Sequence, residues 1–342
     1  MASRIALNGF GRIGRHFLRQ SFGRSDFQVV AVNDLGDLEN LAYLLKYDTV
    51  YGRYDKDISI NKEAGELVVQ GQVIKALQIK DPTQLPWGEM QIDLVIEATG
   101  LFESFEKAKV HLDAGAKRVV ITAPAKDEDG DLGKTILMGI NQNQLETVRM
   151  SSNGSCTTNS ASPVVQVLSE TIGIEKAMLS TVHGYTATQN LVDGPVKGGH
   201  DFRRGRGAAQ NISPSTTGAA IAVTRAISEL KGKFDGLAFR VPVPAGSLSD
   251  ITFLAKRNTS VEEINSILKE AASSPRWQGI LKVTEDQLVS SDILGESYGA
   301  IVDLSLTKVV DGNLVKVLSW YDNEFGYVST LVKHVEVAAT MI

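Results

Sequence analysis

A short glycine-rich loop near the N-terminus constrains the fold more than any other feature of the sequence. Gly9, Gly11 and Gly14 form a G-x-G-x-x-G pattern that follows the apolar run 5–8 and opens a helical pattern. Such glycines allow a tight turn, a close approach of the backbone to a pyrophosphate, and tight packing of helix on strand. Asp34 closes the next predicted strand, where a carboxylate binds a ribose hydroxyl and repels a 2'-phosphate. The pattern therefore predicts a Rossmann-type site for NAD rather than NADP.

Strand and helix patterns alternate through the first half of the chain. Apolar, β-branched runs predict strands at 5–8, 27–33, 91–99 and 118–122, and helical patterns lie at 14–22, 38–47 and 104–114. This alternation is typical of a parallel sheet with right-handed crossovers. Closely spaced apolar residues over 55–77 predict small antiparallel strands, as an insertion or at the sheet edge.

The pattern changes after about residue 153. Helices are predicted at 162–172 and 218–230, strands at 178–183, 236–243 and 249–256, and a long glycine-rich segment without regular structure at 186–213. Long irregular segments of this kind usually carry function. We expect a second domain with a mixed or antiparallel sheet, and a domain boundary near residue 155.

Composition excludes several classes of protein. The chain has 342 residues and a formal net charge of −5, with 43% hydrophobic and 22% charged residues. This balance is typical of a soluble globular protein and argues against a general affinity for nucleic acid. No window approaches ~20 uninterrupted apolar residues, which excludes a membrane span. The first residues lack the pattern of an export signal, so a cytoplasmic protein is predicted.

The chain contains a single cysteine, Cys156, which lies between hydroxyl residues and ahead of an apolar helical run. One cysteine cannot form a disulfide within the chain, and it cannot supply the several thiolates of a typical metal site. No metal is therefore predicted. In the first turn of a helix, the dipole and the unpaired amides would lower the pKa of the thiol and stabilise an oxyanion. Pro163 leaves the start of that helix uncertain by a few residues.

His183 ends the strand that follows this helix, and an imidazole is the base suited to a thiol at neutral pH. From the residues alone, a reactive Cys156–His183 pair and a small core cysteine remain open alternatives. His16, in the first predicted helix, is expected to pack or to face water and not to take part in chemistry.

Several short stretches combine hydroxyls, glycine and arginine, as phosphate sites do. Their candidate residues are Ser155, Thr157, Thr186, Thr188, Arg203, Arg204, Thr217, Gly218 and Arg240. Each stretch alone is more often a helix cap or a turn, so their joint presence with a cysteine is the informative point.

Eight ordered blocks now point to one family. They are NGFGRIGR at 8–15, VND at 32–34, EATG at 97–100, SCTTN at 155–159, HGYTATQ at 183–189, STTGAA at 215–220, FRVPVP at 239–244 and SWYDNEFGY at 319–327. Over essentially its whole length the chain resembles the phosphorylating glyceraldehyde-3-phosphate dehydrogenases.

The resemblance implies a covalent mechanism. Cys156 would attack the aldehyde to give a hemithioacetal, which passes a hydride to NAD and becomes a thioester; inorganic phosphate would then release the acyl phosphate. His183 would activate the thiol. The implied product is 1,3-bisphosphoglycerate, and the implied pathway is glycolysis.

The resemblance also assigns binding residues. It implies that Thr186 and Arg240 hold the substrate's phosphate, and that Ser155, Thr157, Arg204 (or Arg203) and Thr217 hold the attacking phosphate. For the cofactor it implies Asn323 with Tyr327 at the nicotinamide amide, and, on the pyrophosphate and adenosine side, Arg12, Ile13, Lys80, Thr99 and Thr122.

The implied architecture is an α/β chain whose Rossmann-type parallel-sheet domain covers 1–155 and 320–342, with an α+β catalytic domain at 156–319. The segment 323–339 is expected to be a helix returning to the cofactor domain, and the assembly to be a homotetramer. The sequence departs from the family at Gly154 and Ser160, neither of which touches the mechanism. A longer stretch at 126–135 and Lys80 in place of a common arginine make the adenine-side contacts less certain.

Three rival functions remain. A sibling enzyme acting on erythrose 4-phosphate would release its product with water, but Thr216, Thr217 and Gly218 argue against it. A Cys–His acyltransferase or hydrolase would leave the glycine loop unexplained. A non-catalytic nucleotide-binding regulator would be expected to lack Cys156 or His183, and both are present.

Overall fold

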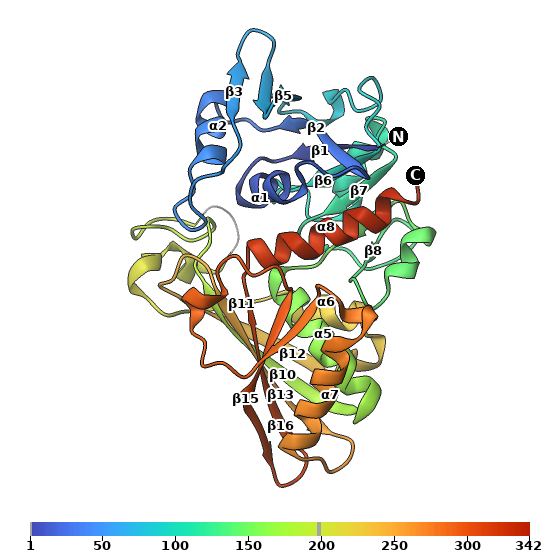
Figure 1. Cartoon of the computed structure of the whole chain (residues 1–342), viewed down its shortest axis with the longest axis vertical. Helices are drawn as coiled ribbons and strands as arrows, with labels where there is room; N and C mark the ends of the chain where they lie inside the picture. Colours follow the sequence, from blue (N-terminus) through green and yellow to red (C-terminus); the bar gives the residue numbers. More distant parts are fainter. Residues whose placement is uncertain (1, 197–199) are drawn as a thin grey trace. The chain divides into compact units, whose positions relative to one another are not determined.

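The computed structural model describes residues 2–196 and 200–342, so the predicted irregular segment 186–213 is described except for residues 197–199 (Figure 1). The chain divides into two compact units. Unit 1 contains the residues up to Ile136 together with Asn141–Gly154 and Leu331–Ile342, and unit 2 contains Leu137–Ile140 and Ser155–Thr330.

Unit 1 is built on a sheet whose strands follow the order β3-β4-β5-β2-β1-β6-β7-β9-β8. Their bounds are Ser3–Asn8 (β1), Phe27–Asn33 (β2), Ile58–Asn61 (β3), Glu66–Val69 (β4), Gln72–Leu77 (β5), Leu94–Glu97 (β6), Arg118–Ile121 (β7), Lys134–Thr135 (β8) and Met150–Ser152 (β9). All neighbours from β5 to β8 in this order pair in parallel, whereas β3, β4 and β5 pair antiparallel. The predicted parallel sheet and the predicted antiparallel strands within 55–77 are both confirmed.

Helices of unit 1 differ from the predictions mainly at their ends. Their bounds are Arg12–Ser21 (α1), Leu38–Lys46 (α2), Phe105–Ala108 (α3) and Val110–Asp113 (α4). The single helix predicted over 104–114 is thus two short helices. Asp127 accepts the backbone N–H groups of Phe105 and Glu106, which fixes the start of α3. The strand predicted at 91–99 is shorter, because Gln91 adopts a positive φ of 52° and the backbone turns there.

Unit 2 contains a mixed sheet with the order β11-β12-β10-β13-β16-β15-β14. The bounds are Ile174–Gly184 (β10), Ser213–Thr216 (β11), Phe234–Val241 (β12), Ser247–Ala255 (β13), Leu281–Thr284 (β14), Ala300–Val310 (β15) and Leu314–Tyr321 (β16). The pairs β10–β12 and β14–β15 are parallel and the others antiparallel. The prediction of a mixed sheet is confirmed, although β12 and β13 each begin two residues earlier than expected.

Helices cover one face of this second sheet. The helix α5 (Cys156–Thr171) packs on β10, β13, β15 and β16 and against α7 (Val261–Ser273), as Figure 1 shows, while α6 (Ala219–Ala226) packs on β12. On β10, Leu179 and Thr181 are fully buried, whereas the alternate residues Met178 and Val182 are exposed. Side chains alternate between the faces of a strand, so the other face of the sheet exposes these apolar side chains among the residues that the structure describes.

The start of α5 is the largest error in the sequence-based prediction. The helix begins at Cys156, six residues before the predicted start at 162, and contains Pro163 in its interior. A proline inside a helix has no N–H to donate to the preceding turn, which is why it is comfortable only near the start. At the C-terminus, α8 (Phe325–Ala339) confirms the predicted final helix, and its residues from Leu331 onward cluster with unit 1.

Candidate active site

The glycine loop of unit 1 is shaped by contacts that exclude side chains. Gly9 has a φ of 99°, and a Cβ there would lie 2.7 Å from the backbone of Ala98 and Thr99. A Cβ on Gly14 would lie 2.3 Å from the carbonyl oxygen of Gly9, so the start of α1 packs directly on the loop. Around Gly11, in contrast, a Cβ would meet nothing within 4 Å. The backbone at Gly11 is therefore open to a ligand beside the N-terminus of α1, where anions are favoured.

A cavity of about 280 Å³ opens beside this loop, at the carboxyl ends of β1, β2 and β6. Five residues predicted to bind the cofactor line it, namely Gly9, Gly11, Asp34, Lys80 and Thr99. The carboxylate of Asp34 accepts the backbone N–H groups of Phe10 (2.7 Å) and Gly36 (2.8 Å), which fixes its orientation. Gly14, Arg12, Ile13 and Thr122 do not line the cavity; the Thr122 hydroxyl donates to the carbonyl of Glu97 at 3.1 Å.

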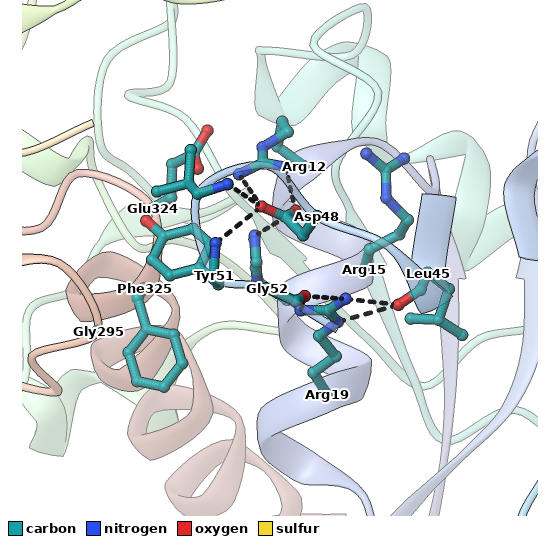
Figure 2. Close-up of polar contacts among 12 residues, drawn as sticks. Arg12, Arg15, Arg19, Leu45, Asp48, Tyr51, Gly52, Gly295, Glu324 and Phe325 are labelled. Atoms are coloured by element: carbon teal, nitrogen blue, oxygen red, sulfur yellow. Dashed lines mark hydrogen bonds and ion pairs between the residues drawn. The ribbon is translucent and has the colours of Figure 1, made fainter. Parts of the chain in front are cut away.

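Arg12, predicted to contact the pyrophosphate, forms an ion pair with Asp48 (Figure 2). Burial raises the pKa of Asp48, but hydrogen bonds from Arg12 and from the backbone of Tyr51 and Val50 outweigh it and lower the pKa. Burial and the charge of Arg12 lower the pKa of His16 to about 3. As expected, His16 packs: its ring lies edge-on to Tyr51, with the centroids 4.6 Å apart.

Glu97 is a buried residue of this region that sequence reasoning assigned no role. Its carboxylate accepts Asn8 Nδ2 (2.6 Å), His111 Nε2 (3.0 Å) and the backbone N–H of Thr99 (2.8 Å). The indole N–H of Trp87 donates to His111 Nδ1 at 3.2 Å, and an indole can only donate, so the His111 proton is on Nε2. This network holds the ends of β1 and β6 in place, and Asn8 and Thr99, which line the cavity, lie there. In the sequence, the sign of such a role was an acidic residue at the end of a buried apolar strand.

In unit 2, Cys156 is the first residue of α5. The side chain of Ser155 accepts the N–H of Thr158 at 3.0 Å, and the Thr158 hydroxyl accepts the N–H of Ser155 at 3.1 Å, so the two residues form a capping box. The pKa of the Cys156 thiol is raised, because burial outweighs the Arg240 charge and the backbone N–H groups of Thr157 and Cys156, which act to lower it. The lowered pKa predicted for a thiol in the first turn is therefore wrong for this structure. The capping box thus fixes a thiol at a helix N-terminus.

His183 lies directly beside this thiol. Its Nε2 is 3.3 Å from Cys156 Sγ, so the structure brings together the two residues predicted to react. Its Nδ1 is 2.6 Å from the carbonyl oxygen of Gly184 and 2.9 Å from Arg240 Nη1. Burial, and next the charge of Arg240, lower the pKa of His183 to about 3, so the ring is neutral at pH 7.

The position of the single ring proton decides what His183 can do. A proton on Nδ1 donates to Gly184 O and leaves Nε2 as the acceptor for the thiol. A proton on Nε2 lets Nδ1 accept from Arg240, because a guanidinium can only donate. Only the first arrangement makes His183 a base toward Cys156.

Among the predicted phosphate residues, the structure links Arg204, Thr188 and Thr186. Arg204 donates to Thr188 Oγ1 and to Ser215 Oγ, each at 2.9 Å, and the Thr186 and Thr188 hydroxyls are 3.0 Å apart. The charge of Arg204 also lowers the pKa of His183 and of Arg240, which lies opposite His183 in the parallel β10–β12 pair. Arg203 is 56% exposed and pairs with Asp201. The geometry favours Arg204 over Arg203 as an active-site residue.

Thr157 and Thr217 have other contacts. The Thr157 hydroxyl is 2.8 Å from the phenol oxygen of Tyr321, which also contacts the Thr181 hydroxyl at 2.7 Å. Tyr321 packs edge-on to His183, a role that sequence reasoning missed although the residue belongs to the block at 319–327. Thr217 accepts the N–H of Ala219 at the start of α6, next to exposed Gly218, and in the described residues no hydrogen bond links it to Cys156 or Arg240.

Asn323 lies just after β16 and belongs to unit 2, as does Tyr327 in the first turn of α8. Both are nearly buried. Asn323 Oδ1 accepts the hydroxyl of Ser247 at 2.9 Å, and Ser247 in turn accepts the N–H of Gly184 at 3.2 Å. The residue predicted for the nicotinamide amide is therefore connected to the residue that follows His183.

The described part of the chain contains no group of three or more His, Cys, Asp or Glu side chains placed to hold a metal ion. It also contains no helix that combines the length and the apolarity needed to cross a bilayer.

Comparisons with known proteins give a consistent result. Residues 3–105 match the family model described as "Glyceraldehyde 3-phosphate dehydrogenase, NAD binding domain", and residues 155–323 match "Glyceraldehyde 3-phosphate dehydrogenase, C-terminal domain". The chain is 48% identical over 338 residues to the glyceraldehyde-3-phosphate dehydrogenase of Clostridium pasteurianum, covering 98% of each chain. It is 47% identical to that of Streptomyces coelicolor and 48% identical to that of Mycobacterium avium, covering 97% of each chain in both cases.

Proposed function

The chain belongs to the glyceraldehyde-3-phosphate dehydrogenase family, and from this premise we propose how its residues divide the work of the reaction. Its activity is the NAD-dependent, phosphorylating oxidation of glyceraldehyde 3-phosphate to 1,3-bisphosphoglycerate, a step of glycolysis.

We assign the cofactor to unit 1, as predicted for the first domain. The open backbone at Gly11, the uncapped N-terminus of α1 and the oriented carboxylate of Asp34 suit a pyrophosphate and an adenosine ribose. The lone pairs of Asp34 not used by Phe10 and Gly36 accept the ribose hydroxyls, and its charge repels a 2'-phosphate. NAD, when bound, supplies the hydride acceptor that converts a hemithioacetal on Cys156 into a thioester.

The 3.3 Å contact between Cys156 Sγ and His183 Nε2 at the start of α5 carries the proposed mechanism. The sulfur forms a bond to the aldehyde carbon, and its proton passes to Nε2 while Nδ1–H donates to Gly184 O. After oxidation, an oxygen of inorganic phosphate attacks the thioester carbon. The carbon–sulfur bond then breaks and the electron pair returns to Cys156. His183 manages the proton in both halves.

Two groups of residues hold the two phosphates. Arg240 and Thr186 bind the phosphate of the aldehyde, and the attacking phosphate is held by Ser155, Thr157, Arg204, Thr188, Thr217 and Gly218. The hydrogen bond from Arg204 to Thr188 supports the second group, and the contact between the Thr188 and Thr186 hydroxyls connects it to the first. The hydroxyls of Ser155 and Thr157 have partners within the protein, so phosphate bound at the start of α5 exchanges with the contacts of Ser155 to Thr158 and of Thr157 to Tyr321.

Absorbance of NADH tests the function directly. The purified protein is supplied with NAD and glyceraldehyde 3-phosphate, with and without inorganic phosphate, and in parallel with erythrose 4-phosphate. Turnover of the three-carbon substrate that depends on phosphate is the expected result. Phosphate-independent turnover of the four-carbon substrate would favour the sibling enzyme, and no reduction of NAD would favour the non-redox classes.

A homotetramer is part of the proposal. It is supported by the uncovered face of the sheet in unit 2, where Met178, Val182, Leu237 and Leu314 are exposed. Apolar patches of this kind mark interaction surfaces. Light scattering during size-exclusion chromatography should give four chains per particle, and a Met178→Asp variant should give fewer.

We also propose a cytoplasmic location, because the mechanism needs Cys156 as a reduced thiol and reducing compartments maintain it. Cell fractionation checks this.

A further inference from the structure

Ser247 connects the two ends of the candidate catalytic site in unit 2. It is the first residue of β13 and is 2% exposed. Its hydroxyl donates to Asn323 Oδ1 at 2.9 Å and accepts the N–H of Gly184 at 3.2 Å. The carbonyl of the same Gly184 is 2.6 Å from His183 Nδ1. One buried hydroxyl therefore lies between the residue that follows the base and the residue assigned to the nicotinamide amide.

The hydrogen bonds of Ser247 also decide which way the Asn323 amide faces. A hydroxyl has one proton and two lone pairs, and the two ends of an amide differ only in that one accepts and the other donates. With Oδ1 toward Ser247, the hydroxyl proton has an acceptor. With the amide reversed, Nδ2 would donate to Ser247 and the hydroxyl proton would lose that acceptor in a buried place, which is costly.

The orientation leaves Nδ2 as a donor. In the residues that the structure describes, Nδ2 donates to no protein atom, so both of its protons remain available to a ligand. A group presented in this way recognises a carbonyl oxygen, such as that of a carboxamide, and does not recognise an amine.

We propose that Ser247 is a positioning residue that holds Asn323 with its Nδ2 donor toward the carboxamide carbonyl of the nicotinamide. The inference deepens the proposed function and rests on the assignment of Asn323 to the nicotinamide. Ser247 touches neither the substrate nor the cofactor and acts through two neighbours. It orients the Asn323 amide, and it binds the N–H of Gly184, whose carbonyl contacts His183 Nδ1.

Binding measurements separate this role from a purely structural one. NAD and ADP-ribose share the adenosine, the pyrophosphate and the second ribose, but only NAD carries the carboxamide. Dissociation constants for both ligands are measured by calorimetry on the intact protein and on its Ser247→Ala variant. We expect the variant to bind NAD roughly tenfold more weakly, the loss of about one oriented hydrogen bond, and to bind ADP-ribose within about twofold of the parent.

Two further variants serve as controls. Ser249 lies two residues along β13 on the same face, is fully buried, and its hydroxyl has no hydrogen-bond partner in the described residues, so Ser249→Ala should leave both affinities unchanged. Ser247→Thr keeps a hydroxyl and should restore most of the NAD affinity. Equal weakening for both ligands in Ser247→Ala, or no weakening for either, would overturn the proposal.

A double-mutant cycle keeps the test decisive if Ser247→Ala folds poorly. In an Asn323→Ala background the amide is gone, so replacing Ser247 by Thr or Ala should change the ratio of NAD to ADP-ribose affinity no further. Additive effects in the cycle would contradict the proposal. The cycle measures binding only, so it is independent of the activity assay. Failure of NAD reduction in the parent protein would reject the proposed function. An unchanged ratio of NAD to ADP-ribose affinity in Ser247→Ala would reject only this inference.

Discussion

The two candidate sites of the chain are built from different materials. In unit 1 the glycine loop offers backbone N–H groups and one carboxylate, and its decisive residues are those that lack side chains. In unit 2 the site consists of ionisable side chains: His183 contacts both Cys156 and Arg240, and the charge of Arg204 acts on His183. A binding site made of backbone depends on steric access, whereas a site made of coupled side chains depends on where each proton lies. Substitutions in the glycine loop should therefore change the affinity for NAD, whereas substitution of Cys156 should change turnover.

The largest effect is expected for Cys156→Ser. A hydroxyl is a far weaker nucleophile than a thiolate, so NAD reduction should fall by ~10⁴-fold or more. The rate is followed by NADH absorbance with glyceraldehyde 3-phosphate. NAD affinity, measured by calorimetry, should stay within about twofold if the two sites are as distinct as described. Substantial residual turnover in this variant would contradict the thioester mechanism.

Arg204 and Arg203 are adjacent in sequence but differ in their contacts, which provides a matched pair. Arg204→Ala removes a guanidinium bound to Thr188 and Ser215, and loss of a charge-assisted contact of ~1.5–3 kcal/mol should raise the KM for inorganic phosphate ~10- to 100-fold. Arg203→Ala, at an exposed position, should change it less than about twofold. The KM values are obtained from initial rates at varied phosphate concentration. Equal changes of KM in the two variants would reject the assignment of Arg204.

Gly11→Ala tests the backbone site. A Cβ at Gly11 meets no protein atom, so the fold should tolerate it, but the Cβ would occupy the space of a pyrophosphate and weaken NAD binding roughly tenfold. Gly130→Ala is the control, because Gly130 lies in the same unit and is equally open. Thermal unfolding should be similar for the two variants. Unchanged NAD affinity in Gly11→Ala would show that the cofactor does not approach this loop.

Lowering the pH should reduce the stability of the two units unequally. His16 and His334 in unit 1 and His183 in unit 2 have pKa values lowered to about 3, in each case first by burial. The unfolded imidazoles take up protons as the pH falls through about 6.5, whereas the folded ones stay neutral down to about 3, so stability falls with pH in this window. Each contributes ~1.4 kcal/mol per pH unit. Hydrogen exchange at pH 5 and pH 7 should show a greater loss of protection in unit 1; equal losses would contradict this.

Local patterns made unit 1 the more predictable half. The loop, its flanking strand and helix, and Asp34 are close in sequence, so spacing alone predicted the parallel sheet and the glycine site. The Cys156–His183 contact depends on how α5 lies against β10, which no local pattern determines, and the resemblance to a family was needed to favour it. The choice between Arg203 and Arg204 required the positions of Thr188 and Ser215.

Contacts between distant residues account for what was missed. The Glu97–His111–Trp87 network joins residues on separate elements, and the Tyr321 contacts join β16 to α5 and β10. The helix start at Cys156 was predicted six residues late. Pro163 suggested a helix start close to it, whereas the capping box of Ser155 and Thr158 determines where the helix begins.

Because Cys156 is the only cysteine and stands at the head of α5, each chain carries one sulfur atom that a thiol-specific label can modify, and it lies at the site of chemistry. The stoichiometry of a maleimide dye would therefore count intact catalytic centres in a preparation, with no need to engineer away other thiols. The same atom would provide a single attachment point for an electrophilic inhibitor or a spectroscopic probe.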